Sequence, residues 1–337
     1  MLRLLGILVT VVAAVAAAII TWPQFFRLER TFPIAQIVSL RGAVVVACLA
    51  VALLALLLCL VRPLRAFAGS IVVIALVAGI LNAGILVSRG LGEATLPEKT
   101  DAAIRVMTWN TAGAATDAET IAKTAVAMQA DIVALPETTE ATGIDVALAM
   151  KEMGSPMWVH EENYEGWDAN WTTLLISPDL GDYAVVESTS GSTTNTSEVP
   201  SVVAMPVDGD GPIVVAVHAV APRQRYMEAW RTDLRWLADQ CASEDVIMAG
   251  DFNATVDNMA RLGLEDGTLG RCRDAAVDTG NGAMGTWSTD LPALLGTPID
   301  HVMATGTWRA TGSVVLTSMD GAGSDHRPLV VQLEPAD

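Results

Sequence analysis

The 337-residue sequence is poor in the residues that build several common kinds of site. It has four cysteines and four histidines, with no Cys-x-x-Cys pair and no Cys/His cluster at zinc-ligand spacing, which excludes a zinc-finger type of centre. Lysine is absent from residues 1–93 and scarce afterwards. No basic stripe with interleaved aromatic residues occurs, so the face that nucleic-acid enzymes normally present is missing.

Charge divides the chain into two parts. Residues 1–93 hold seven arginines against Glu29 and Glu93, a net charge of +5, and residues 94–337 hold 13 basic and 36 acidic side chains, a net charge of −23. Three runs in the first part contain no charged residue: Leu4–Ile20, Ala43–Val61 and Ala68–Val87. Each approaches the roughly 20 residues that a helix needs to cross a bilayer. We predict a membrane domain over 1–90, with transmembrane helices at about 4–21, 43–61 and 68–88.

The orientation of these spans follows from arginines in the loops between them. Arg62 and Arg65 lie in the short second loop without an acidic neighbour, which places that loop in the cytoplasm and everything after the third span outside the cell. The first loop argues the opposite, because it carries Arg27, Arg30 and Arg41. We expect a multi-pass protein of the cell membrane with its acidic domain extracytoplasmic.

Residues 91–103 mix glycine, proline and charge and are interpreted as a linker. From Ile104 onwards, short apolar strands alternate with a few segments of helical periodicity, Asp117–Gln129 and Glu228–Gln240. The expected strands are Ile104–Thr108, Asp131–Leu135, Leu174–Ser177, Tyr183–Glu187, Val202–Val207, Ile213–His218, Val246–Ala249, Ile299–Ala304, Ser313–Thr317 and Leu329–Leu333. This pattern predicts one α/β sandwich domain over 104–337.

Two of the four cysteines, Cys48 and Cys59, fall in the second apolar run. Cys241 and Cys272 are the only pair in the acidic domain. They could form a disulfide outside the cell and would stay reduced in the cytoplasm, so the sequence leaves both states open.

Polar residues recur where the expected strands end. At such ends lie Asn110, Glu137, His218, Asp251 and Asn253. Asp300 lies within the strand Ile299–Ala304, and Asp325 and His326 come directly before the last strand. Side chains at strand ends leave the core while the sheet holds them rigidly, which suits a catalytic cluster. Asp251 and Asn253 are two residues apart in extended chain and should point to the same side.

The segments that carry these residues resemble, in order, the motifs of the endonuclease/exonuclease/phosphatase superfamily: WNTAG, ADIVALPETT, VAVHAVAP, IMAGDFNAT, IDHVM and GSDHRPLV. The resemblance covers roughly residues 104–334 and implies two packed mixed β-sheets flanked by helices, the four-layer DNase I-like sandwich. Together with the three spans, the chain also resembles the VanJ-type glycopeptide-resistance membrane proteins of actinobacteria.

The resemblance implies a metal-dependent phosphoesterase. Glu137 would bind Mg²⁺ or Mn²⁺, with Asn110 and Asp325 as further metal-site residues. Asp251 would deprotonate the attacking water, Asn253 and His218 would donate to phosphate oxygens, and Asp300 would hold His326 as a donor or acid. Ala112 stands where many nucleases of the superfamily have an acid or amide, which weakens the case for a second metal.

Residues outside the motifs are open to two interpretations. Arg223, Arg225 and Arg231 follow the His218 motif and could bind a second phosphate or an anionic head group, or simply form a solvated helix face. His301 should point away from Asp300 and is interpreted as structural.

Charge and location favour one substrate class. A domain of net charge −23 repels nucleic acid, and a membrane tether suits a phosphorylated lipid or head group of the membrane or cell envelope. We therefore expect hydrolysis of a lipid phosphate ester, diester or pyrophosphate. An extracytoplasmic nuclease and a non-catalytic envelope receptor or scaffold are the alternatives.

Overall fold

The computed structural model describes residues 2–92, 95–164, 166–188 and 194–336 of the chain. The chain divides into two compact units, residues Met1–Ser88 and Arg89–Asp337.

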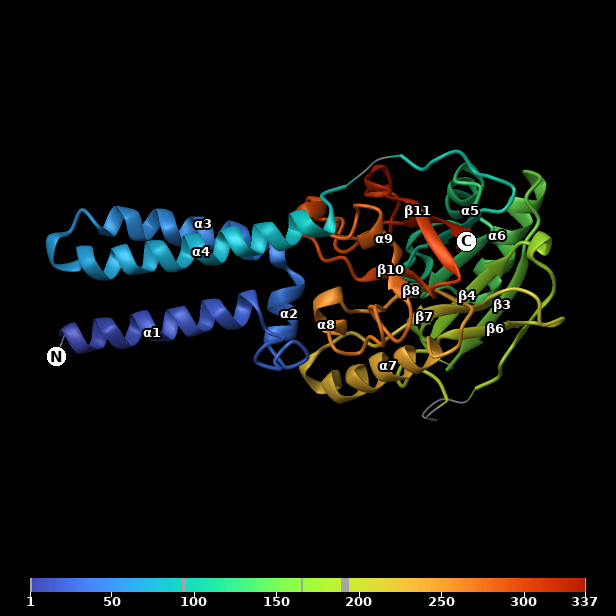
Figure 1. Ribbon diagram of the computed structural model, residues 1–337. Helices are drawn as coiled ribbons and strands as arrows, with labels where there is room; N and C mark the ends of the chain where they lie inside the picture. Colours follow the sequence, from blue (N-terminus) through green and yellow to red (C-terminus); the bar gives the residue numbers. More distant parts are fainter. Residues whose placement is uncertain (1, 93–94, 165, 189–193, 337) are drawn as a thin grey trace. The chain divides into compact units, whose positions relative to one another are not determined.

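The first unit is helical (Figure 1). It contains α1 (Leu2–Thr21), α2 (Ile34–Ser39), α3 (Arg41–Leu58), a short 3₁₀ turn η1 (Arg62–Leu64) and α4 (Arg65–Arg89). By length and composition, three segments are long and apolar enough to cross a membrane: Leu4–Thr21, Arg41–Leu58 and Arg62–Arg89. They coincide with the three apolar runs of the sequence to within a few residues at most ends.

A small polar network lies among the apolar helices of this unit. The buried guanidinium of Arg41 donates a hydrogen bond to the side-chain oxygen of Asn82, which is fully buried. The Asn82 amide in turn donates to the hydroxyl of Thr21 at 3.1 Å. These contacts connect α1, α3 and α4, and they satisfy polar groups that would be costly to leave unpaired in hydrocarbon.

The second unit is built on two six-stranded sheets. The first has the order β11-β12-β1-β2-β4-β3 and the second β5-β6-β7-β8-β10-β9. The pairs β1/β2 and β7/β8 are parallel, and the other neighbours are antiparallel, so both sheets are mixed. The strands are β1 (Ile104–Thr108), β2 (Ile132–Pro136), β3 (Trp158–Asn163), β4 (Trp171–Ile176), β5 (Tyr183–Val185), β6 (Val202–Pro206), β7 (Ile213–His218), β8 (Val246–Asp251), β9 (Arg273–Asp274), β10 (Asp300–Ala304), β11 (Trp308–Val315) and β12 (Leu329–Pro335).

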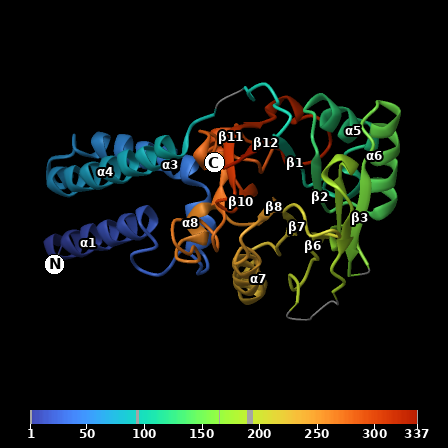
Figure 2. The ribbon, with the colours of Figure 1, turned by 45° about the vertical axis from the view of Figure 1, so that its right-hand side comes forward.

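Helices flank the sheets. The longer ones are α5 (Ala118–Ala127), α6 (Glu140–Glu152) and α7 (Met227–Gln240), and α8 (Val256–Met259) and α9 (Ala275–Asp278) are single turns. Figures 1 and 2 show α5 and α6 side by side at one flank of the unit and α7 at another. The structure thus confirms the predicted architecture of two mixed sheets flanked by helices.

Alternation along the strands produces two apolar cores. One face of each sheet contributes to the core between them, with side chains such as Val106, Ala134, Ala216, Ala249 and Val302. The opposite face of the first sheet packs on α5 and α6 through a second cluster that includes Met107, Val133, Ile121 and Met150. Side chains alternate between the two faces of a strand. A residue two positions along the strand from an inter-sheet core residue therefore points to the same, inter-sheet face.

The sequence prediction lacks the longer elements α6 and β3 of the second unit, and also the short elements α8, β9 and α9. Strand β3 reads Trp-Val-His-Glu-Glu-Asn and lies at the edge of its sheet, where acidic side chains can face solvent. Helix α6 contains Gly143, which packs within contact distance of Thr173 on β4. The predicted strand at Ser313–Thr317 is longer and earlier in the structure, where β11 begins at Trp308.

Cys241 and Cys272 form a disulfide, with their Cα atoms 5.6 Å apart. Both residues are fully buried. The bond joins the end of α7 to the segment that leads into β9. Of the two oxidation states that the sequence left open, the structure contains the oxidised one.

Candidate active site

The register of three strands places three polar side chains in one row of the second sheet. Asp300, the first residue of β10, lies opposite Asp251, the last residue of β8. His218, the last residue of β7, lies beside Asp251 in the parallel pairing. The residues two positions inward on each strand, Ala216, Ala249 and Val302, belong to the inter-sheet core. The row therefore continues the buried face of the sheet to the point where the apolar core ends.

The first sheet contributes Asn110 and Glu137 from the ends of its parallel strands β1 and β2. The Asn110 amide donates to Glu137 Oε1 at 3.0 Å and to Asp251 Oδ2 at 3.1 Å, so it links the two sheets. The side-chain oxygen Oδ1 of Asn110 accepts a hydrogen bond from the backbone N–H of Ala112 at 2.9 Å. Asn110 thus orients both carboxylates, and its expected place in a metal site stays a prediction.

Glu137 leaves β2 through a left-handed backbone conformation, with φ of 56°. The buried hydroxyl of Thr111 accompanies this turn, donating to the Glu137 carbonyl at 3.2 Å and to the Gly113 carbonyl at 3.0 Å. A non-glycine residue in this region is uncommon and costs energy unless its surroundings hold it. The turn directs Glu137 to the polar cluster, where its Oε1 is 3.8 Å from His218 Nε2.

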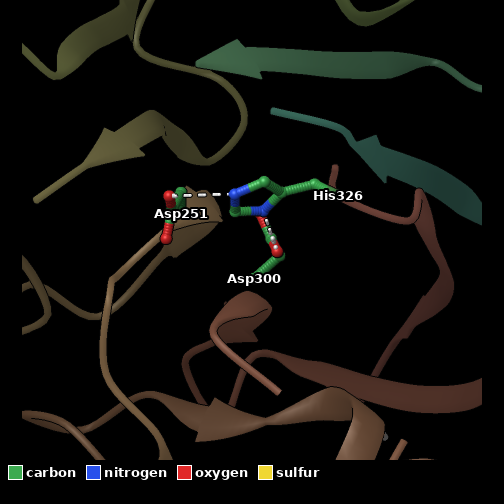
Figure 3. Close-up of side chains that lie close together, drawn as sticks. All are labelled: Asp251, Asp300 and His326. Atoms are coloured by element: carbon green, nitrogen blue, oxygen red, sulfur yellow. Dashed lines mark hydrogen bonds and ion pairs between the residues drawn. The ribbon is translucent and has the colours of Figure 1, made fainter. Parts of the chain in front are cut away.

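Figure 3 shows His326 between two aspartates. Its Nδ1 is 2.8 Å from Asp300 Oδ2, and its Nε2 is 4.0 Å from Asp251 Oδ2. Ser324 fixes the backbone next to His326. Its hydroxyl donates to the backbone carbonyl of Asn110 at 2.6 Å and accepts from the backbone N–H of His326 at 3.0 Å. Asp300 therefore contacts the His326 ring directly, and the catalytic role expected of this pair stays a prediction.

Asn253 folds back on Asp251. Its backbone N–H donates to Asp251 Oδ1 at 2.8 Å, and its side-chain amide donates to Asp251 Oδ2 at 3.1 Å and to the Ala219 carbonyl at 2.9 Å. Asn253 also has a left-handed backbone, with φ of 46°. The pair therefore shares one side of the chain, as the spacing of two predicted, but through a tight turn after β8 rather than extended strand.

Burial and neighbouring charges shift the pKa values of this cluster in different directions. Burial and the adjacent charge of Asp300 raise the pKa of Asp251 to about 7. Burial alone would lower the pKa of His326, but the charge and hydrogen bond of Asp300, with Asp251 and Asp325, raise it to about 10. Burial lowers the pKa of His218 to about 4 despite the nearby Glu137. At neutral pH the cluster thus contains a protonated His326, a neutral His218 and an Asp251 close to its titration midpoint.

Asp325 is exposed and is held by an aromatic residue that the sequence analysis did not single out. The indole N–H of Trp287 donates to Asp325 Oδ2 at 2.8 Å. The loop that carries Trp287 is fixed by the fully buried Arg327, whose guanidinium donates to the carbonyls of Gly285, Ser288, Thr289 and Leu291 and to both carboxylate oxygens of Asp320. Arg327 follows His326 directly, so the motif itself organises this loop.

None of the contacts described above involves the three candidate arginines. Arg223 and Arg225 are exposed at the turn η5 (Gln224–Tyr226), where the Arg225 guanidinium stacks 4.5 Å above the ring of Tyr226. Arg231 lies on α7 and is partly buried. Their role in phosphate binding stays a prediction. His301 is buried, with Nδ1 on Asp274 and Nε2 on the Ala254 carbonyl at 2.8 Å, which fits the structural role expected for it.

The donor set fits a divalent cation. Ligand atoms of Asp251, Asp300 and His326 lie within 4.8 Å of one another, and among the described residues no hydrogen-bond partner reaches the buried Asp300 Oδ1. The sequence analysis assigned the metal to Glu137, Asn110 and Asp325 instead. Asp300 and His326 of this group are already hydrogen-bonded to each other, and the assignment of the metal to Glu137, Asn110 and Asp325 stays a prediction.

Comparison with known proteins identifies the class. The sequence model of the Endonuclease/Exonuclease/phosphatase family matches residues 107–326, and the chain belongs to this family. The chain combines a phosphoesterase-type hydrolase domain with an N-terminal segment that contains three candidate membrane spans. The family generally uses a divalent metal, which agrees with the donor set. No curated protein matches the chain significantly.

Solved structures share the fold. An endonuclease/exonuclease/phosphatase from Beutenbergia cavernae DSM 12333 has a TM-score of 0.54 and 19% identity, over 70% of this chain and 72% of that one. D. rerio TDP2 complexed with single strand DNA product has a TM-score of 0.52 and 18% identity, over 69% and 100%. A family protein from Bacteroides thetaiotaomicron has a TM-score of 0.51 and 15% identity, over 71% and 100%. At these identities the likeness shows the fold, which is DNase I-like.

Proposed function

We propose that the chain is a membrane-anchored, Mg²⁺- or Mn²⁺-dependent phosphoesterase that hydrolyses a phosphate ester, diester or pyrophosphate of a membrane or cell-envelope lipid. The observation that carries the proposal is the row of Asp251, Asp300 and His218 at the end of the inter-sheet core, joined by Asn110 to Glu137 of the other sheet. Such a convergence of carboxylates, amides and imidazoles from strand ends suits phosphoryl chemistry.

Each side chain has a task that its surroundings support. Asp251, with its pKa raised to about 7, accepts the proton of the attacking water. Protonated His326, oriented by Asp300, donates to the phosphate or the leaving oxygen. Neutral His218 donates to a phosphate oxygen. The Asn253 amide already donates to Asp251 and to the Ala219 carbonyl, so we assign Asn253 to orienting the base, and the donation to phosphate expected of it stays a prediction. A divalent cation held by Glu137, with Asn110 and Asp325 nearby, supplies charge neutralisation for the phosphate.

The location outside the cytoplasm rests on two observations. The Cys241–Cys272 disulfide is of a kind that persists in oxidising compartments. The arginines of the second loop, Arg62 and Arg65, also favour a cytoplasmic position for that loop. A reporter fused to the C-terminus of the full chain tests this orientation. The resemblance to VanJ-type membrane proteins supports a substrate in the envelope, and an acidic domain suits a tethered lipid better than a free polyanion.

A nuclease is the second candidate, because the fold is shared with D. rerio TDP2, whose structure holds a single strand DNA product. A non-catalytic receptor is a third, which the complete polar cluster disfavours. The test is a phosphoester panel with the full chain in detergent, with Mg²⁺, Mn²⁺ or chelator, and with Asp251→Ala and His326→Ala. Asp179→Ala, an exposed acid of the short turn η4 (Pro178–Leu180), is the control.

We expect metal-dependent turnover of lipid phosphoesters that both site variants abolish and the control retains. Turnover that persists in both variants or in chelator would exclude this mechanism. Cleavage of plasmid DNA at physiological salt in place of lipid would favour the nuclease, and metal binding without any turnover would favour the receptor.

A further inference from the structure

A pocket of about 570 Å³ opens beside Glu137. Two short turns form its walls: Ala112–Ala114 after β1, and Gly166–Ala169 before β4. Glu137 belongs both to the pocket lining and to the polar cluster, so the pocket adjoins the cluster.

The walls are held in place by contacts that start at the cluster. Thr111 ties the first turn to the Glu137 backbone through its hydroxyl. The second turn packs against the first at Gly113, where a β-carbon would lie 3.3 Å from the Asp168 side chain. The left-handed Gly113, with φ of 71°, is therefore needed both for the turn and for the close approach of Asp168.

The chemistry of the lining is unusual for a phosphate-binding protein. Most of its side chains are alanine or glycine, the charged ones are Glu137 and Asp168, and no described lining residue is basic. Trp167 is 83% exposed, which leaves its ring open to solvent at the pocket. An open indole ring offers a flat apolar surface for a ring-shaped ligand, and a carboxylate accepts hydrogen bonds from hydroxyl groups but repels a second phosphate.

We propose that Trp167 and Asp168 form a specificity pocket for an uncharged, hydroxyl-bearing ring, such as a sugar or cyclic polyol, esterified to the scissile phosphate and lacking a second phosphate group. This inference rests on the proposed phosphoesterase function and adds the class of its organic group. Trp167 packs against the face of the ring. Asp168 accepts its hydroxyl hydrogen bonds and discriminates against polyphosphorylated rings. The ring can belong to a lipid head group or to a free phosphate ester, which present the same chemistry.

The test uses the full chain in detergent micelles and two matched pairs of substrates that differ only in a second phosphate. The lipid pair is phosphatidylinositol and phosphatidylinositol 4-phosphate, and the soluble pair is inositol 1-phosphate and inositol 1,4-bisphosphate. Turnover of p-nitrophenyl phosphate and of bis(p-nitrophenyl) phosphate reports the hydrolytic activity itself, because these esters carry no polyol ring. The lipid and soluble pairs also distinguish the two sources of the ring.

We expect the singly phosphorylated member of at least one pair to have the higher kcat/KM, by roughly tenfold, the order expected for one carboxylate facing a phosphate across a partly exposed pocket. Trp167→Ala should raise KM for that substrate about tenfold with little change in kcat. Trp158→Ala, which removes a 55% exposed tryptophan on β3, is its matched control. Asp168→Asn should reduce the ratio of kcat/KM between the singly and the doubly phosphorylated substrate of that pair. Asp179→Asn should leave this ratio unchanged.

The outcomes separate the two levels of the proposal. No turnover of any ester, including the nitrophenyl esters, overturns the phosphoesterase function and this inference with it. Nitrophenyl turnover that depends on Asp251, combined with equal or greater activity on the doubly phosphorylated members or with none on either pair, overturns only the specificity pocket. So does a Trp167→Ala variant whose KM matches that of Trp158→Ala.

Discussion

The indole N–H of Trp287 donates a 2.8 Å hydrogen bond to the carboxylate of Asp325, 38 residues further along the chain. The bond matters because Asp325 adjoins His326 and contributes to the raised pKa of that histidine. Trp287 is itself placed by Arg327, which donates to the carbonyls on either side of it in the same loop. The segment Asp325 to Arg327 is thus bonded to a loop that is distant in the sequence.

Removing this hydrogen bond should weaken metal binding if Asp325 belongs to the metal site. Trp287→Phe keeps an aromatic ring and loses the donor. We expect the Kd for Mn²⁺ measured by calorimetry to rise roughly fivefold to tenfold, about 1–1.4 kcal/mol, which is less than the 1.5–3 kcal/mol of a hydrogen bond to a charged group because this pair is exposed to solvent. Trp308→Phe is the matched control, because Trp308 donates in the same way to Asp245, at 2.6 Å. Equal Mn²⁺ affinity in the two variants would show that Asp325 does not depend on Trp287.

The pH dependence of activity should follow the two shifted groups. Asp251 must lose its proton to act as a base, so kcat/KM should rise with pH through about 7, and His326 must keep its proton, so kcat/KM should fall through about 10. Asp300→Asn removes the carboxylate that raises the pKa of His326. It should move the falling limb to lower pH, and an unmoved limb would mean that another group titrates there.

Metal binding should stabilise the catalytic domain, because a cation relieves repulsion among Asp251, Asp300 and Glu137. At a Mg²⁺ concentration of about 100 times Kd the gain is about 2.7 kcal/mol, which should raise Tm by several degrees in a thermal melt. Glu137→Gln should remove most of this increase. Glu140→Gln, an exposed acid in the first turn of α6, should retain it, and an equal loss in both variants would argue against Glu137 as a ligand.

The disulfide should contribute substantially to stability. Cys241 and Cys272 are 31 residues apart, and closing a loop of this length stabilises a fold by about 4 kcal/mol in the chain-entropy estimate. Reduction, or Cys272→Ala, should therefore lower Tm of the catalytic domain markedly in a denaturation experiment. Cys48→Ala and Cys59→Ala each remove a free thiol and leave the disulfide in place. In both variants reductant should therefore still lower Tm.

Gly250 should tolerate no side chain. It precedes Asp251 with φ of 152°, and a β-carbon there would lie 2.0 Å from the Val217 carbonyl oxygen on the neighbouring strand. Gly250→Ala should force β7 and β8 apart and lower both Tm and activity. Gly306→Ala is the control, since no atom of the described residues would lie within 4 Å of a β-carbon added there. Unchanged Tm in both variants would contradict the close approach.

The parts of the fold that sequence predicts well are those with strong local patterns. Strands β1 and β7 have the predicted bounds, because apolar runs ending in a polar residue set them off. Edge strand β3 was missed because Glu161 and Glu162 make it resemble a loop. The motif residues could be singled out because each lies at or next to one end of a recognisable strand. Trp287 could not, because its contact with Asp325 depends on a chain fold that no local pattern encodes.

The pairing of β8 with β10 has a consequence for how this domain can change. Asp251 and Asp300 face each other only at one register, and shifting either strand by a single residue would turn its carboxylate to the opposite side of the sheet. Insertions and deletions inside these strands should therefore abolish hydrolysis even in variants that still fold. Sequence length can vary in the connecting loops, whereas the strands themselves must keep their residue count.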